Sequence, residues 1–286
     1  MKIAITTETT CDLSPELIAQ NDIKILPLMV LLGEKSGLDG IDITPQDIFD
    51  YAENHKDLPK TSAVNEFSYE EFFSDVLKDY DAIVHIALSS GLSSSCQNAI
   101  NVSKKMKNVY VIDSLNLSTG IGLQVLYAAR LRDKGLAPEE IVKRVISRRA
   151  SVQASFFVNT IDYLYKGGRC SKVAMLGANL LRIKPQIIVK TNDGTMTPGS
   201  KYFGRKTQAC KAYCEDVLKT FNNPDKSIIF ITHTHANQEV VDVARNILID
   251  KGFKNIQETY AGATITSHCG QGTLGILYYN DGGVED

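Results

Sequence analysis

Apolar runs of strand type alternate with helical patterns over the first half of the chain. The strand-type runs cover residues 2–6, 23–32, 82–88 and 108–114. Apolar residues recur at helical spacing in the segments between and after them, residues 15–21, 45–54, 69–80, 95–106 and 119–135. Strands that alternate with helices at this spacing predict an α/β fold with a mostly parallel, doubly wound sheet.

The pattern changes near residue 150, where alternating strand segments become more frequent and helices fewer. These strand segments cover residues 154–160, 186–191, 194–203, 227–235, 256–262 and 273–280. Asn192-Asp193-Gly194 lies between two of them and is a strong hairpin signal. We therefore predict two domains, an α/β domain over residues 1–150 and an α+β domain over residues 151–286.

Composition and charge exclude several classes of protein. The 286 residues are 43% hydrophobic and carry a formal net charge of −2, so no general attraction to nucleic acid or anionic membranes is expected. The basic cluster within residues 143–149 is expected to be one solvated helix face. No run approaches the roughly 20 apolar residues of a membrane span, and the first ten residues hold too short an apolar stretch for a secretory signal.

The six cysteines are scattered and do not form a disulfide framework. Reduced thiols in the cytoplasm are the simplest interpretation. Cys210 and Cys214 are spaced i, i+4, and His233 and His235 flank Thr234, but no regular ligand spacing supports a zinc site. We expect a cytoplasmic protein without a bound metal or cofactor.

The most polar turn of the first half is SSGLSSSCQNA, residues 89–99, at the end of a predicted strand and the start of a helix. A hydrolase nucleophile turn would read G-x-S-x-G, and the second Gly is missing after Ser93. A phosphate cradle would carry Lys or Arg, and the turn has neither. A singly charged carboxylate suits its hydroxyls and helix N–H groups better. The alternative is that Ser89, Ser90 and Ser93 only cap the helix.

Two later segments also carry polar candidates near glycines. Gly167-Gly168 precedes Arg169, in a turn that would bring a guanidinium close to an anion, although an isolated Arg after a turn is ordinarily a surface residue. His268 lies among glycines, which allow the backbone to come close to a ligand. The alternative for His268 is a loop histidine with no role.

Taken together, these motifs resemble the DegV family of fatty-acid-binding proteins nearly end to end. The turn SSGLSSSCQNA and the segment YLYKGGRCS are the most specific. The other matching motifs, in family order, are Thr61-Ser62, Ile112-Asp113-Ser114 with Gly120 and Gly122, Gly204-Arg205, and Ser267-His268 with Gly270 and Gly272. The chain departs from the family pattern at residues 63–65 and at residues 269 and 271, and it has Glu8-Thr9 where many members have Asp-Ser.

The resemblance implies a non-catalytic, two-domain carrier that holds one long-chain fatty acid, such as palmitate, between its domains. Thr61 and Ser93 match hydroxyls that bind the carboxylate, with Ser62 adjacent. His268 and Arg169 match head-group positions, and Arg205 matches a recurrent Arg that contacts the head group or a partner. The resemblance also implies a role in lipid transport or fatty acid metabolism, in several members through a separate fatty acid kinase subunit that makes an acyl phosphate.

Other interpretations remain open at the level of sequence. One is a small-ester hydrolase or phosphatase-like enzyme with Ser93 as nucleophile and His268 as base. Another is a regulatory module whose lipid is a structural filler. The apolar segments 25–32, 155–159 and 173–181 are candidates for the wall of an acyl tunnel, although ordinary core packing is the simpler explanation of each.

Overall fold

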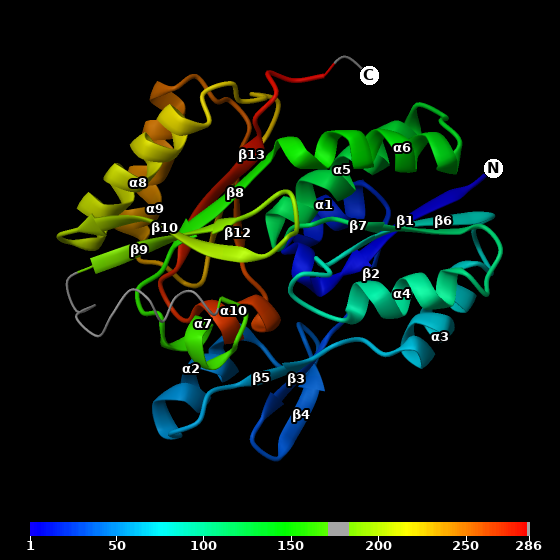
Figure 1. Ribbon diagram of the computed structural model, residues 1–286, viewed down its shortest axis with the longest axis horizontal. Coiled ribbons are helices and arrows are strands. Elements are labelled where there is room, and N and C mark those ends of the chain that lie inside the picture. Colours follow the sequence, from blue (N-terminus) through cyan, green and yellow to red (C-terminus); the bar gives the residue numbers. More distant parts are fainter. Residues whose placement is uncertain (171–182, 285–286) are drawn as a thin grey trace.

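The computed structural model describes residues 1–170 and 183–284 of the chain, and their strands form three sheets (Figure 1). A four-stranded sheet has the order β2-β1-β6-β7, and a six-stranded sheet has the order β10-β9-β8-β13-β11-β12. A three-stranded sheet, β4-β3-β5, lies below the junction of the two larger sheets in the view of Figure 1. The predicted class, a parallel α/β sheet followed by a second sheet, is confirmed.

The four-stranded sheet is parallel throughout and covered by helices on both faces. Its strands are β1 (Ile3–Glu8), β2 (Ile23–Leu26), β6 (Ala82–Ala87) and β7 (Val109–Asp113). Alternate β1 side chains enter two clusters. Ile5 packs in a cluster with Ile121 and Ile141 from α5 (Thr119–Asp133) and α6 (Pro138–Arg148). Ala4 packs with Phe73 of α3 (Glu66–Val76) and with α4 (Ser95–Ser103), so the sheet is doubly wound.

The six-stranded sheet is mixed, and one of its faces is covered by two long helices. Its strands are β8 (Val152–Phe157), β9 (Ile183–Val189), β10 (Met196–Phe203), β11 (Ile229–His233), β12 (Ile256–Tyr260) and β13 (Leu274–Tyr279). β11 and β12 pair in parallel, and the other pairs are antiparallel. α8 (Lys206–Thr220) and α9 (Gln238–Asp250) cover one face. The predicted hairpin is confirmed, because β9 and β10 pair on either side of residues 192–194.

The three-stranded sheet was not predicted, and it corrects the interpretation of residues 23–32 as one strand. That run divides at Pro27 into β2 of the parallel sheet and β3 (Met29–Leu32), which pairs with β4 (Lys35–Leu38) and β5 (Lys60–Ser62). Proline has no N–H for a sheet ladder, which favours a change of partner there. A small core joins this sheet to α2 (Pro45–Asn54) and to Ala263 of α10 (Ala263–Cys269).

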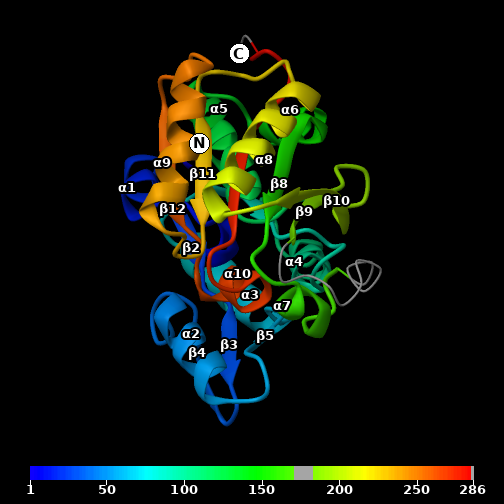
Figure 2. The same ribbon diagram turned by 90° about the vertical axis from the view of Figure 1, so that its left-hand side faces the viewer.

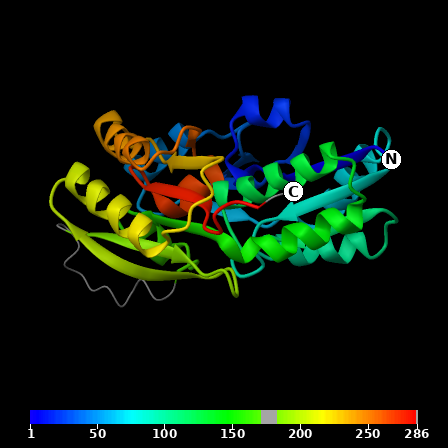
Figure 3. The same ribbon diagram turned by 90° about the horizontal axis from the view of Figure 1, so that it is seen from above.

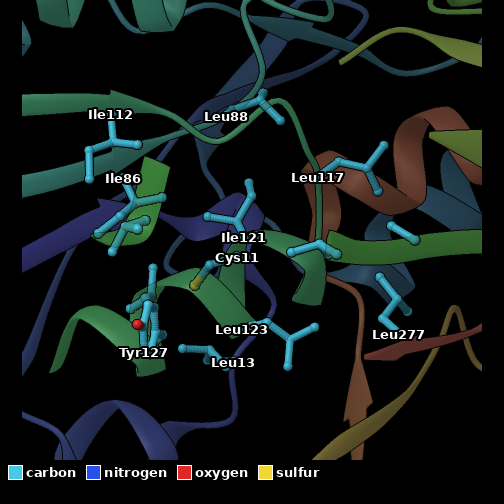
Figure 4. Packing of buried hydrophobic residues seen from close by; sticks show 14 of the residues in the cluster. Cys11, Leu13, Ile86, Leu88, Ile112, Leu117, Ile121, Leu123, Tyr127 and Leu277 are labelled. Atoms are coloured by element: carbon cyan, nitrogen blue, oxygen red, sulfur yellow. The ribbon is translucent and has the colours of Figure 1, made fainter. Parts of the chain in front are cut away.

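Helix α5 lies at the junction of the two large sheets, which run end to end along the molecule (Figure 3). One buried cluster contains Ile5 and Ile86 of the first sheet, Ile121 of α5, and Phe230 and Leu277 of the second. Figure 4 shows Ile86, Ile121 and Leu277 of this cluster. The expected boundary near residue 150 falls between the two sheets in sequence, but this core crosses it. The division into domains over 1–150 and 151–286 stays a prediction.

The prediction of a solvated basic face over residues 143–149 is wrong for Arg148. This side chain is 5% exposed and stacks on the ring of Tyr279, with its guanidinium carbon 3.7 Å from the ring centroid. It pairs with Asp225 at 2.6 Å and with Asp281 at 2.9 Å. Its partners are more than 75 residues distant in sequence, so the local pattern gave no sign of them.

Candidate ligand-binding site

A cavity of about 50 Å³ lies where the three sheets meet, lined by side chains of β5 and β10, of α10 and of the segments that follow β2 and β6. Figure 2 shows α10 beside the upper ends of β3 and β5, between the three-stranded sheet below and the larger sheets above. The lining residues are Leu28, Thr61, Ser62, Ala63, Leu88, Leu92, Ser93, Leu117, Arg169, Met196, Thr264, Ile265, His268 and Cys269. Five of the six candidates named from the sequence therefore line one cavity. We call it the head-group cavity.

Thr61 and His268, which are 207 residues apart in sequence, form the polar corner of this cavity. Thr61 Oγ1 and His268 Nε2 lie 2.8 Å apart. β5 carries Thr61, and the last turn of α10 carries His268, so the expectation of a loop histidine is wrong. The small core under α10 fixes the helix against the three-stranded sheet and thereby holds the two side chains together.

The electrostatics of His268 leave the Thr61 proton available to a ligand. Burial lowers the pKa of His268 to about 4, and the Arg169 guanidinium adds to the effect, so the imidazole is neutral at pH 7. Nδ1 is buried and has no hydrogen-bond partner among the described residues. An orphaned buried N–H is rarer than an orphaned acceptor, which favours the tautomer with the proton on Nε2. Nε2–H then donates to Thr61, and the Thr61 hydroxyl is left to donate to an anion.

A glycine is required beside His268. A Cβ on Gly167 would lie 2.6 Å from His268 Nδ1 and 2.7 Å from the backbone oxygen of Tyr163. Real Cβ atoms do not approach other atoms so closely, and the Tyr163 oxygen belongs to the backbone of α7 (Asp162–Lys166) and cannot move aside. The Gly-Gly turn suspected from the sequence therefore lets α7 approach the imidazole.

Ser93 reaches the cavity from the serine-rich turn after β6. Its Oγ accepts a hydrogen bond from the Ser95 N–H at 3.2 Å and lies 2.9 Å from Ser95 Oγ. The turn is fixed at its start by Ser89, whose hydroxyl donates to the Gly194 carbonyl of the β9–β10 hairpin at 2.9 Å. The capping alternative is only partly correct: Ser93 accepts from the first N–H of α4, whereas the Ser89 hydroxyl donates away from the helix, and the N-cap residue, Ser94, makes no side-chain cap hydrogen bond.

The remaining candidates lie at the edge of the cavity or away from it. Arg169 is exposed and donates to the Gly167 carbonyl at 2.7 Å. Ser62 is exposed on β5, and its hydroxyl contacts the Ala63 carbonyl at 3.4 Å. Arg205 is the N-cap of α8 and exposed, and it does not line the head-group cavity.

A second, smaller cavity of about 30 Å³ lies beside the first. The two share Leu117, Ile265 and Cys269 in their walls. The second cavity reaches Phe156 of β8 and Leu277 of β13. Among the candidate tunnel segments, 25–32 contributes Leu28 to the head-group cavity and 155–159 contributes Phe156 to the second one. Segment 173–181 lies outside the described residues.

On the outer side of the Thr61–His268 contact lies a wider opening of about 490 Å³, which we call the basic vestibule. It shares Thr61, Arg169 and His268 with the head-group cavity. Its charged lining residues are Lys56, Lys60, Lys166, Arg169 and Asp57. Asp57 accepts a hydrogen bond from Tyr51 at 2.7 Å. Four cations thus face one carboxylate. Lys56 was not a candidate at the level of sequence, and Lys166 lies inside the motif YLYKGGRCS but was not singled out there.

The described residues do not assemble the machinery of the hydrolase interpretation. A serine nucleophile requires a base within hydrogen-bond reach and a third group that orients the base. His268 Nε2 contacts Thr61 instead of Ser93, and among residues 1–170 and 183–284 its Nδ1 meets no carboxylate. Over the same residues, no group of His, Cys, Asp and Glu is arranged to hold a metal ion. None of the helices described is both long and apolar enough to cross a membrane.

Comparison with known proteins shows a similarity to the DegV family over nearly the whole chain. A family profile described as "Uncharacterised protein, DegV family" matches residues 2–281. A DegV domain-containing protein of Clostridium acetobutylicum is 33% identical over 97% of this chain and 98% of its own length.

Two solved structures share the fold over nearly the whole chain. A DegV family protein from Thermus thermophilus, described as fatty acid binding, has a TM-score of 0.88 at 26% identity and covers 98% of this chain and 99% of its own. DegV from Bacillus subtilis, described as a fatty acid binding protein, has a TM-score of 0.85 at 27% identity, with the same coverage.

Proposed function

Because the chain belongs to the DegV family, we propose that it binds a long-chain fatty acid such as palmitate. Thr61 and Ser93 donate hydrogen bonds to the carboxylate, Arg169 supplies the positive charge, and the tail runs past Leu117 and Ile265. The observation that carries the proposal is the polar corner formed by Thr61 and His268, 2.8 Å apart, which shares one cavity with Ser93 and adjoins a second cavity that reaches Phe156 and Leu277.

The tail supplies the affinity, and the polar corner supplies the orientation. Burying about 14 methylenes at roughly 0.8 kcal/mol each favours binding by about 10 kcal/mol as an upper bound, before association costs. A buried carboxylate without partners costs several kcal/mol. Two hydroxyl donors and one nearby cation offset that cost, because hydrogen bonds to a charged group are the stronger kind.

The acyl chain enters by displacing side chains between the two cavities. Cavities of about 50 and 30 Å³ are well below the roughly 300 Å³ or more of typical ligand sites. The shared wall is made by Leu117, Ile265 and Cys269. Leu117 lies in the loop before α5 and Ile265 is only partly buried, so these two side chains are the ones expected to rotate on binding.

A titration with palmitate tests the assignment of the carboxylate ligands. Replacing Thr61 and Ser93 together with alanine removes both donors, and the dissociation constant is expected to rise at least tenfold. Ser90→Ala is the matched control, since Ser90 lies on the same turn but its hydroxyl donates to Asp113 at 2.5 Å and does not line the cavity. A double variant that binds palmitate like the wild type would make the assignment wrong.

In its cellular role the protein is a non-catalytic carrier that presents the carboxyl group to a fatty acid kinase subunit in the cytoplasm. The basic vestibule supports this role, because four cations beside the carboxylate suit a group with more than one negative charge, such as a transferred phosphate. Six free cysteines fit a reducing compartment. Arg205, exposed at the start of α8, is a candidate contact for the partner.

The kinase role is tested with glutamine substitutions in the vestibule. The triple variant of Lys56, Lys60 and Lys166 should bind palmitate like the wild type but form acyl phosphate at least tenfold more slowly with a fatty acid kinase subunit. The control triple variant replaces three exposed lysines outside the vestibule, Lys104, Lys107 and Lys254. Equal rates of acyl phosphate formation for both variants would mean that the lysines of the vestibule have no role in phosphoryl transfer.

A further inference from the structure

A completely buried carboxylate lies behind the head-group turn, and the proposed function makes no use of it. Glu8, the last residue of β1, is 0% exposed. Its Oε1 accepts a hydrogen bond from the Tyr69 hydroxyl at 2.5 Å and lies 3.2 Å from His85 Nε2. Its Oε2 accepts from the Leu88 N–H at 2.9 Å. Three partners, from α3, β6 and the turn after β6, therefore converge on one side chain.

Glu8 is ionised in spite of its burial. Burial alone raises the pKa of a carboxyl group, but the His85 ring and the hydrogen bonds from His85, Tyr69 and Leu88 outweigh it and lower the pKa of Glu8 below its ordinary value. The other ring nitrogen of His85 lies 2.8 Å from the Thr6 hydroxyl, and Phe73 packs edge-on against the ring. A buried ionic arrangement of this kind adds little net stability compared with an apolar core, so it needs another explanation.

A short path connects Glu8 to Ser93 through the backbone. Leu88, whose N–H donates to Glu8, is the first residue after β6, lines the head-group cavity and begins the turn that carries Ser93. The far end of the turn is held by Ser95, whose N–H donates to Ser93 Oγ and whose Oγ accepts from the Val64 N–H at 3.1 Å.

The charge of Glu8 fixes the direction of its own hydrogen bonds. An ionised carboxylate can only accept, so Tyr69 donates its single proton to Glu8 and Leu88 donates its N–H. The start of the turn is therefore tied to a buried acceptor, and the position of Ser93 in the cavity depends on this tie.

We propose that Glu8 is a positioning residue for ligand binding, which acts through the Leu88 N–H to hold the turn that places Ser93 beside the carboxylate of the ligand. The inference rests on the proposed function, since it assumes an anion beside Ser93. It assigns a role to a buried residue about 80 positions away from the turn in sequence.

Two substitutions and a matched control test the proposal. Glu8→Gln replaces one acceptor oxygen with an NH₂ group that cannot accept from either Tyr69 or Leu88. Tyr69→Phe removes only the hydroxyl. Each is expected to weaken palmitate binding about tenfold, the loss of about one well-placed charged hydrogen bond. Tyr213→Phe is the control, because Tyr213 is also fully buried and donates to the Ser155 carbonyl at 2.6 Å, but it packs under the six-stranded sheet.

A double-mutant cycle separates positioning from general destabilisation. If Glu8 acts through Ser93, Glu8→Gln should have almost no further effect on palmitate affinity in a Ser93→Ala background, whereas it should keep its full effect with Tyr213→Phe. Additive effects of Glu8→Gln and Ser93→Ala would overturn the proposal. Wild-type palmitate affinity in folded Tyr69→Phe would also overturn the proposal. This second variant keeps the test possible if Glu8→Gln does not fold.

Amide hydrogen exchange without ligand distinguishes a failure of this proposal from a failure of the proposed function. Glu8→Gln should speed exchange at least tenfold at the amides of residues 88–95, while Tyr213→Phe leaves them unchanged. If the wild type binds no palmitate but Glu8→Gln still speeds exchange in this turn, the carrier function is contradicted and the positioning role of Glu8 for the turn stands. Unchanged exchange in both variants would overturn the positioning role whatever the ligand.

Discussion

At the scale of single residues, the head-group cavity is distinguished by how little charge it carries. Arg169 is the one charged side chain among its lining residues at neutral pH, because His268 is neutral. The hydroxyls of Thr61 and Ser93 face the same space. One cation and two donors match a singly charged carboxylate. The larger charge of a phosphate is matched by the vestibule outside, where three lysines join Arg169.

The neutral state of His268 predicts a specific pH dependence of stability. Its pKa is about 4 in the folded protein and about 6.5 in an unfolded chain. Between these values the unfolded chain binds a proton that the folded chain does not, so the free energy of unfolding falls as the pH falls. From pH 7 to pH 5 this single group should cost up to about 2 kcal/mol.

Urea unfolding at pH 7 and pH 5 checks this prediction with wild type and His268→Gln. Glutamine does not titrate, so the loss of stability between the two pH values should be up to about 2 kcal/mol smaller in the variant. Equal losses in both proteins would mean that His268 is already protonated in the folded state at pH 5.

At the scale of elements, the sequence predicted those features that depend on local spacing. The alternation of strands and helices in the first sheet follows from residues that are neighbours in sequence, and so does the hairpin at Asn192-Asp193-Gly194. The division of residues 23–32 between two sheets and the burial of Arg148 depend on distant partners. Local periodicity contains no information about such partners.

The candidate site was accessible from sequence mainly through its motifs. Thr61, Ser93, Arg169 and His268 each belong to a family motif, and they line one cavity. Ser95 lies inside the serine-rich turn but has no feature that sets it apart from its neighbours. Leu117 and Met196 line the cavity, and Glu8 holds the turn behind it. Their roles can be seen only in the folded structure, because they come from chain segments far apart in sequence.

Arg148 connects helix α6 to the second sheet, because it stacks on Tyr279 of β13 and pairs with Asp225 and Asp281. Replacing it is therefore expected to lower the free energy of unfolding strongly. Arg148→Met leaves Asp225 and Asp281 without their buried partner, which should lower the free energy of unfolding by about 3–5 kcal/mol. Lys143→Met on the same helix is the control, because Lys143 is 79% exposed and its Glu140 partner is 3.9 Å away. Similar unfolding free energies for the two variants would mean that the pairing of Arg148 with Asp225 and Asp281 does not hold α6 in place.

At the scale of the whole molecule, the two large sheets share one hydrophobic core. α5 contributes Ile121 to the cluster that also contains Ile5 of the first sheet and Leu277 of the second (Figure 4). Residues 1–150 and residues 151–286 each supply only part of this core, so neither segment can form it alone. We therefore predict a single unfolding transition.

Calorimetry and two spectroscopic probes check this prediction. The calorimetric and van't Hoff enthalpies of unfolding should agree, and the transitions seen by the probes should coincide. A fragment of residues 1–150 should not give a cooperative transition. Two separated transitions in the full chain would instead show that the halves fold independently.

The central claim is that the chain carries a long-chain fatty acid, and organic extraction of the purified protein followed by mass spectrometry tests it most directly. The account predicts about one fatty acid of palmitate-like length per chain, much reduced in the Thr61→Ala, Ser93→Ala double variant. Wild-type protein that yields no fatty acid and takes up none when incubated with palmitate would contradict the account.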